Sequence, residues 1–130
     1  MIQVAQGAEQ AEPLSIEYHA QDATQYKSDT PFDIVLAVYL LHYAPTQEVL
    51  QAMCHAIAAN LKSGGRFVTY QLNPDMAREQ DYYKHLGLNI NVPEAQTDGE
   101  PVPFSVTVGD ITMPEVMAYR WNKDTVEAVL

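Results

Sequence analysis

The feature that most constrains the fold is an unbroken apolar run at residues 34–41, which lies between Pro31 and Pro45. The run has neither alternation nor a polar face, which is typical of a strand covered on both sides in a parallel sheet. A buried helix is the alternative, but the β-branched residues and the two prolines favour a strand. The sequence therefore predicts a buried β-strand at this position.

A helical pattern and a second strand follow this run. Five apolar residues after Pro45 fall on one helical stripe: Leu50, Met53, Cys54, Ile57 and Leu61. Thr46 is placed to cap the helix, and Lys62 and Gly64 are expected at its end. A short apolar strand is predicted at residues 66–72. Two apolar strands joined by a helix imply a right-handed parallel crossover, which is the unit of a doubly wound α/β sheet.

Shorter patterns flank this unit. Residues 1–11 read as an amphipathic helix that ends before Pro13, and residues 16–19 as a short strand closed by Asp22. Alternating apolar residues in the ranges 88–92, 102–108 and 116–121 predict antiparallel strands, with turns at residues 98–99 and 109–110. Asn122 and Asp124 predict the start of another helix.

Composition limits the partners and the compartment. The chain has 130 residues, enough for one modest core, and 7 basic against 17 acidic residues give a net charge of −10. Such a charge repels nucleic-acid phosphates and anionic lipids, so we predict neither a nucleic-acid nor a membrane partner. The longest apolar run is too short to span a bilayer, and the single cysteine, Cys54, excludes an intrachain disulfide. We therefore expect a reducing cytoplasm.

Two motifs carry a resemblance to a known family. They are FDIVLAVYLLHYAP at residues 32–45 and LKSGGRFV at residues 61–68. Their order and spacing resemble the central strand–helix–strand unit of the class I S-adenosylmethionine-dependent methyltransferases, in particular members that act on small molecules. The resemblance implies a partial Rossmann-like methyltransferase fold, an α/β parallel sheet with helices on both faces and an antiparallel strand extension. Residues 1–74 would form the central part, and residues 75–130, a helix and antiparallel strands, a substrate-side extension.

The resemblance also implies a function and a cofactor site. The reaction would be methyl transfer from S-adenosylmethionine to a small-molecule substrate. Ligands of open parallel sheets bind at the carboxyl ends of the strands. In the family, the acid at Asp22 accepts a hydrogen bond from the adenine amino group, the backbone at Ala23 meets the ring, and Val38 and Tyr39 face the methionine part. The alternative for Asp22 is a carboxylate that only caps a turn.

His42 follows at the lip of the same cleft and is the candidate catalytic residue. Its ordinary pKa of ~6.5 would allow it to act as a general base toward a substrate hydroxyl or amine. The alternative is that His42 merely caps or packs against the next helix. No metal site is predicted, because His19, His55 and His85 show no metal-ligand spacing.

One family motif is absent from these residues. No G-x-G-x-x-G loop occurs, and the first residues match the helix that follows the family's second strand. The family's first two strands are therefore expected upstream of Met1 and its last helix and hairpin downstream of Leu130. Because the first strand lies between the strands at residues 16–19 and 34–41, their edges would be open, and we expect self-association or a partner chain that supplies the missing strands. Two alternatives remain, a noncatalytic methyltransferase-derived binding module and another doubly wound nucleotide-dependent enzyme.

Overall fold

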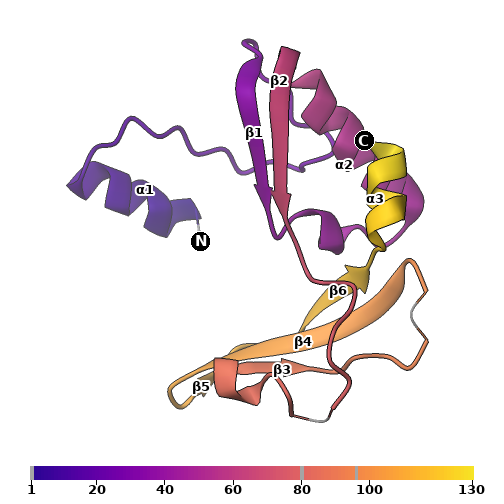
Figure 1. Ribbon diagram of the computed structural model, residues 1–130. Coiled ribbons are helices and arrows are strands. Elements are labelled where there is room, and N and C mark those ends of the chain that lie inside the picture. Colours follow the sequence, from indigo (N-terminus) through magenta and orange to yellow (C-terminus); the bar gives the residue numbers. More distant parts are fainter. Residues whose placement is uncertain (1, 80, 96) are drawn as a thin grey trace.

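The computed structural model describes residues 2–79, 81–95 and 97–130, which form two small sheets with two helices packed beside one of them (Figure 1). The elements are α1 (Ile2–Ala11), β1 (Phe32–Val38), a 3-10 turn (Leu41–Tyr43), α2 (Gln47–Ala59), β2 (Leu61–Tyr70), a 3-10 turn (Lys84–Leu86), β3 (Leu88–Ile90), β4 (Glu100–Val108), β5 (Ile111–Thr112), β6 (Val116–Arg120) and α3 (Lys123–Val129).

The predicted parallel crossover is confirmed. β1 and β2 are parallel, with Leu36 opposite Val68 and Val38 opposite Tyr70, and α2 connects them. The Thr46 hydroxyl caps α2 by accepting from the Val49 N–H at 3.4 Å. The α/β unit thus forms because an apolar strand, a capped amphipathic helix and a second apolar strand follow one another in sequence.

The antiparallel extension is also confirmed. β4 pairs with β3 on one side and with β6 on the other, and it forms a hairpin with β5. Gly109 has a φ of 59° in that hairpin turn, and Gly99 has a φ of 76° before β4. Both predicted turns therefore use a backbone conformation that glycine adopts without steric cost. The helix expected after Asn122 is α3.

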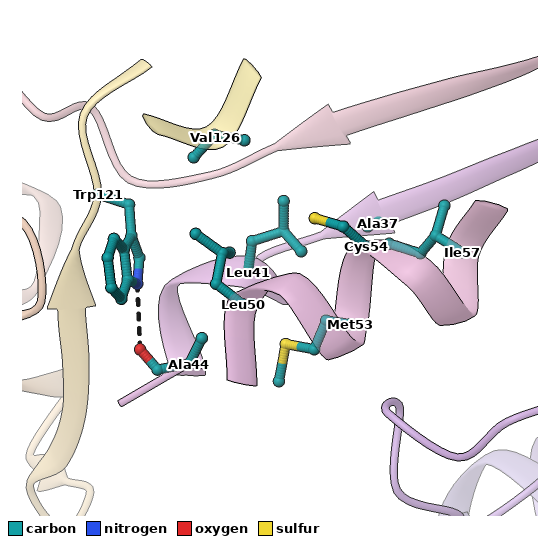
Figure 2. Close-up of a cluster of buried hydrophobic side chains, with 9 residues drawn as sticks. All are labelled: Ala37, Leu41, Ala44, Leu50, Met53, Cys54, Ile57, Trp121 and Val126. Atoms are coloured by element: carbon teal, nitrogen blue, oxygen red, sulfur yellow. Dashed lines mark hydrogen bonds between the residues drawn. The ribbon is translucent and has the colours of Figure 1, made fainter. Parts of the chain in front are cut away.

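The core lies between the parallel strands and the helices α2 and α3. Its buried residues come from β1, the first 3-10 turn, α2, the end of β6 and α3 (Figure 2). Leu41 and Leu50 are completely buried, and each such side chain contributes roughly 1.5–3 kcal/mol to the free energy of unfolding. Trp121 closes the cluster from the antiparallel side, so one core joins both sheets.

The opposite face of the parallel strands is bare. Five large side chains on it are 48–62% exposed: Ile34, Leu36, Val38, Val68 and Tyr70. α1 lies on this side, away from α2 (Figure 1), but it buries none of its described residues. Helices had been expected on both faces, and the described residues supply packed helices to one. In that described part, no helix has the length and apolar character needed to cross a bilayer.

The predicted strand at residues 16–19 is wrong. These residues form no regular secondary structure and pair with no strand among the described residues. Ser15 has a φ of 63°, and the Glu9 carboxylate accepts from the backbone N–H groups of Leu14 and Ile16 at 2.7 and 3.2 Å. A strand needs a neighbouring strand to form hydrogen bonds with its backbone N–H and C=O groups. Here the Glu9 side chain accepts from two backbone N–H groups of the segment instead.

Several predicted boundaries also move. α2 ends at Ala59 because the Asn60 side chain donates to the Ala56 carbonyl at 2.7 Å and to the Tyr26 carbonyl at 2.9 Å. Lys62 and Gly64 therefore belong to β2, which starts earlier than predicted and ends at Tyr70 instead of residue 72. Lys62 pairs with Asp33 at 2.8 Å, so the helix end that was assigned to Lys62 and Gly64 is wrong. β1 ends at Val38, before the predicted residue 41.

Candidate cofactor and substrate site

The carboxyl ends of β1 and β2 meet at one edge of the parallel sheet. The Tyr39 N–H donates to the Tyr70 carbonyl at 2.7 Å, directly after the paired residues Val38 and Tyr70. Tyr39 has a φ of 52°, a left-handed conformation that costs a tyrosine roughly 1–3 kcal/mol and is concentrated at functional sites. Val38 and Tyr39 are 53% and 46% exposed. Both residues predicted for the methionine part of the cofactor therefore lie accessible at the expected edge.

Aromatic rings cluster at this edge. The ring of Tyr39 lies 5.3 Å from that of Tyr70 and 5.6 Å from that of His42, and the Tyr43 ring lies 4.4 Å from His42. Desolvation, followed by the neighbouring Tyr70, raises the pKa of Tyr39. The tyrosine is thus a neutral hydroxyl at physiological pH, and the cluster offers π faces to a ligand at the strand ends.

His42 lies beneath this cluster rather than at an open lip. It is 4% exposed, and burial lowers its pKa from the ordinary value of 6.5. Its Nδ1 has no hydrogen-bond partner among the described residues. His42 is therefore a neutral, enclosed imidazole, and its role as general base stays a prediction.

Asp22 caps a turn in the segment before β1. Its Oδ1 accepts from the Thr24 N–H and the Thr24 hydroxyl, both at 2.8 Å, and these bonds lower the Asp22 pKa. The carboxylate is exposed, and Ala23 beside it is half-buried. No hydrogen bond between described residues links this pair to Val38 or Tyr39, so the adenine contact predicted for Asp22 and Ala23 stays a prediction.

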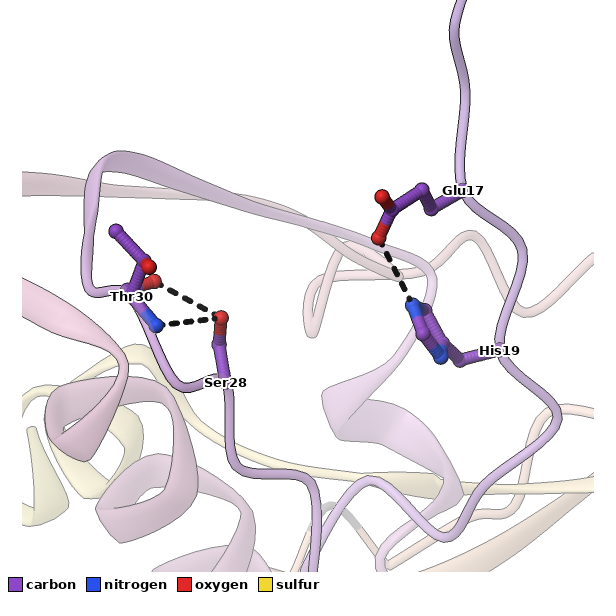
Figure 3. A network of polar contacts seen from close by, with 4 residues as sticks. All are labelled: Glu17, His19, Ser28 and Thr30. Carbon is purple, nitrogen blue, oxygen red and sulfur yellow. Dashed lines mark hydrogen bonds and ion pairs between the residues drawn. The ribbon is translucent and has the colours of Figure 1, made fainter.

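An apolar groove of about 470 Å³ runs along the free edge of β1. Residues of the segment 19–26, including Ala23, form one wall, and Ile57 and Asn60 of α2 line the groove as well. Local polar contacts shape this segment: His19 pairs with Glu17 at 3.6 Å, and Ser28 Oγ donates to the Thr30 carbonyl at 2.9 Å (Figure 3). Sequence patterns did not reveal the groove, because it depends on which strands flank β1.

A second pocket of about 420 Å³ lies in the antiparallel extension. Tyr82 and Tyr83 line it together with Asn89, Asn91 and Glu115. Trp121 lies in the core and does not line this pocket. The pocket combines aromatic faces with amide and carboxylate groups, a lining suited to a small polar molecule. The polar residues on β3 and β4 gave no sequence signal beyond strand alternation.

Comparisons with known proteins agree with this architecture. A family model described as a methyltransferase domain matches residues 1–65. Similar solved structures are an S-adenosylmethionine-dependent methyltransferase from Clostridium acetobutylicum (TM-score 0.64, 16% identity), the PH0226 protein from Pyrococcus horikoshii (0.67, 20%) and DesVI from Streptomyces venezuelae (0.64, 17%). They cover 96%, 99% and 96% of this chain, respectively. No curated protein gives a match.

The same structures are longer than this chain. Its residues span 56%, 58% and 59% of the Clostridium, Pyrococcus and Streptomyces chains. The predicted Rossmann-like methyltransferase fold is thus confirmed as a partial one relative to these structures.

Proposed function

The chain belongs to the methyltransferase domain family, and on that premise we propose that it serves in methyl transfer from S-adenosylmethionine to a small-molecule acceptor, within a larger or completed protein. The observation that carries the proposal is the edge where β1 and β2 end together. There Tyr39 is held in a left-handed conformation beside Tyr70, and both side chains are accessible. Ligands of open parallel sheets bind at such an edge.

The residues present fit part of the cofactor. Val38 and Tyr39 would hold the methionine end, and Asp22 with Ala23 the adenine. When bound, S-adenosylmethionine supplies a methyl group on a sulfonium cation. The negative net charge and the exposed faces of Tyr39 and Tyr70 favour a cation at this edge. The chain's own contribution would be to position the reactants, which carries much of the rate in such displacements.

The pocket in the extension is the proposed acceptor site. Its volume of about 420 Å³ is in the range of small-molecule sites. Tyr82 is 53% exposed and offers a stacking surface, while Asn89 and Asn91 offer donors and acceptors. We therefore propose a small polar acceptor.

The free edge of β1 supports the proposal that further strands complete the sheet. The backbone groups of successive strand residues point alternately to the two neighbours. Since the Tyr39 N–H faces β2, the N–H groups of Ile34, Leu36 and Val38 point to the free edge of β1. Strands from a partner chain or from a second copy would satisfy these groups.

The proposal extends to the cellular compartment. The buried, free thiol of Cys54 suits a reducing environment, and we propose that the protein is cytoplasmic.

Titration calorimetry with S-adenosylmethionine tests the cofactor proposal. We expect the chain alone to bind more weakly than micromolar, because no glycine-rich loop is among its residues, and to bind tightly once the neighbouring strands are supplied.

In that completed protein, Asp22→Ala should weaken binding by roughly 1–3 kcal/mol with little effect on folding. Asp29→Ala, in the same exposed segment, is the matched control. An unchanged affinity with a lowered melting temperature would establish Asp22 as a turn cap only.

One observation favours a second candidate, a noncatalytic methyltransferase-derived binding module. Asp22 Oδ1 is already engaged twice by Thr24, so the proposed adenine contact must use the remaining oxygen. If the completed protein does not bind S-adenosylmethionine at all, this candidate is preferred. The family match argues against the other alternative, a different doubly wound nucleotide-dependent enzyme.

A further inference from the structure

Two residues that each carry an enclosed polar atom line one small cavity between the two sheets. His42 belongs to the 3-10 turn after β1, and Gln71 directly follows β2. Within the described part of the chain, His42 Nδ1 and Gln71 Oε1 are fully buried without a hydrogen-bond partner. Both residues line the same cavity. Buried polar atoms are almost always hydrogen-bonded, so this pair points to a ligand.

The size of the cavity determines what that ligand is. Its volume is about 10 Å³, close to the least that holds one water molecule. An ammonium group carried on a substrate or any larger molecule would not fit. A buried water also needs two to four polar partners, and the cavity must supply them.

A third polar group completes the set of partners. Arg120, at the end of β6, lines the cavity, is 8% exposed and donates from Nε to the Pro74 carbonyl at 3.0 Å. A guanidinium has five N–H donors and no acceptor, whereas the Gln71 side-chain oxygen only accepts. A water molecule has two hydrogens and two lone pairs, which match two acceptors and one donor.

We propose that the cavity binds one water molecule, which donates to Gln71 Oε1 and His42 Nδ1 and accepts from Arg120, and that this water fixes the proton of His42 on Nε2. The hydrogen bond at one ring nitrogen decides which nitrogen carries the proton in a neutral imidazole. The lowered pKa of His42 keeps the ring neutral at pH 7 and is consistent with this assignment.

The consequence concerns what His42 can offer to a ligand. With its proton on Nε2, the ring presents a donor on that side and no lone pair. His42 then acts as a positioning residue beneath the rings of Tyr39 and Tyr43, and not as a general base. The inference goes beyond the proposed function, because it concerns the chain's own hydrogen bonds and holds whether or not the protein transfers methyl groups.

Nuclear magnetic resonance of the full chain with ¹⁵N-labelled histidine tests this directly. His42→Gln identifies the His42 signals, and the exposed His55 serves as the internal reference. Long-range proton–nitrogen spectra at pH 7 to 8 should show His42 with a protonated Nε2 and a bare Nδ1. A proton on Nδ1, or rapid averaging of both tautomers as expected for the exposed His55, would overturn the proposal.

Two variants of Gln71 test the water itself. Gln71→Leu removes the acceptor, so the long-lived water signal seen by nuclear Overhauser effects should disappear and the His42 tautomers should average. Gln71→Asn keeps a neutral amide acceptor, so both the water signal and the Nε2 tautomer of His42 should persist. A water signal and tautomer unchanged in Gln71→Leu would contradict the bridging role. If that variant does not fold, the unmodified chain still decides the proposal, because it must show both the bound water and the Nε2 proton.

Discussion

Trp121 donates its indole N–H to the carbonyl of Ala44 at 3.0 Å, across 77 residues of sequence. Ala44 follows the 3-10 turn after β1, and Trp121 follows β6, so this bond joins the parallel unit to the antiparallel extension (Figure 2). Both residues are buried, Trp121 at 6% and Ala44 at 0% exposure. The parallel unit, which carries the proposed cofactor edge, is therefore fixed through Trp121 to the extension that carries the proposed acceptor pocket.

Trp121→Phe should remove this bond and leave a small cavity. The Ala44 carbonyl would stay buried without its donor, and we expect a loss of roughly 2–4 kcal/mol in the free energy of unfolding. Urea denaturation measures it. Tyr82→Phe, which alters an exposed aromatic residue of the extension, should change stability little. Equal effects of the two substitutions would argue against a shared core.

Asp98 should stabilise the start of α3. Its Oδ1 accepts from the Asn122 N–H at 2.6 Å, and its Oδ2 accepts from the Thr125 hydroxyl. Burial acts against the charged form, but these hydrogen bonds lower the Asp98 pKa overall. Asp98→Ala should cost about 1 kcal/mol, as for the loss of a helix cap. A double-mutant cycle with Thr125→Val, read by thermal unfolding, should show that the two effects are not additive.

Acid should destabilise the protein through His42. Its folded-state pKa is below the unfolded value of 6.5, so the unfolded chain binds more protons between the two values. The contribution of neutral His42 to the free energy of unfolding is therefore fully present above pH 6.5. It is lost as the pH falls toward the pKa of the folded state. His42→Gln should flatten this part of the stability profile, whereas the exposed His55→Gln should leave it unchanged. A profile that stays the same in His42→Gln would mean that the ring is not buried as a neutral group.

The bare face of the parallel strands should drive association. Leu36 and Ile34 are 62% and 61% exposed on it, and large apolar patches with an open strand edge recruit partners. The purified chain should sediment as more than a monomer at micromolar concentration, and Leu36→Lys should reduce this. Ile111→Lys, at a residue 73% exposed in the extension, is the control. A compact, cooperatively melting monomer of the unmodified chain would show that neither the edge nor the face needs a partner.

The sequence predicted the elements whose determinants are local. The apolar run before Pro45, the cap at Thr46 and the glycine turn at Gly109 were sufficient to place β1, α2 and the turn after β4, whereas the short strand β5 was not predicted. The strand expected at residues 16–19 failed because a strand depends on neighbours that the sequence pattern does not contain. The end of α2 was missed for a similar reason, since Asn60 bonds with residues 26 and 28, more than 30 positions away.

The sequence predicted only part of the candidate site, because some of its features are local and others depend on distant segments. Val38 and Tyr39 follow from the end of a strand, whereas the burial of His42 depends on the rings of Tyr39 and Tyr43 and on the antiparallel sheet. The partnership of His42 with Gln71 and Arg120 joins three segments that no sequence spacing relates. Side-chain identity thus indicated the position of the site, and tertiary packing decides what each residue can do there.

Mapping the binding of S-adenosylmethionine by amide chemical shifts tests the central claim most directly, namely that the paired ends of β1 and β2 form the cofactor edge. With the cofactor at several millimolar, the signals of Ala23 and Tyr39 should shift in a saturable way, while that of Ile111 in the distant hairpin should not. Shifts confined to the extension, or none at Tyr39 when the cofactor is present at these concentrations, would contradict it.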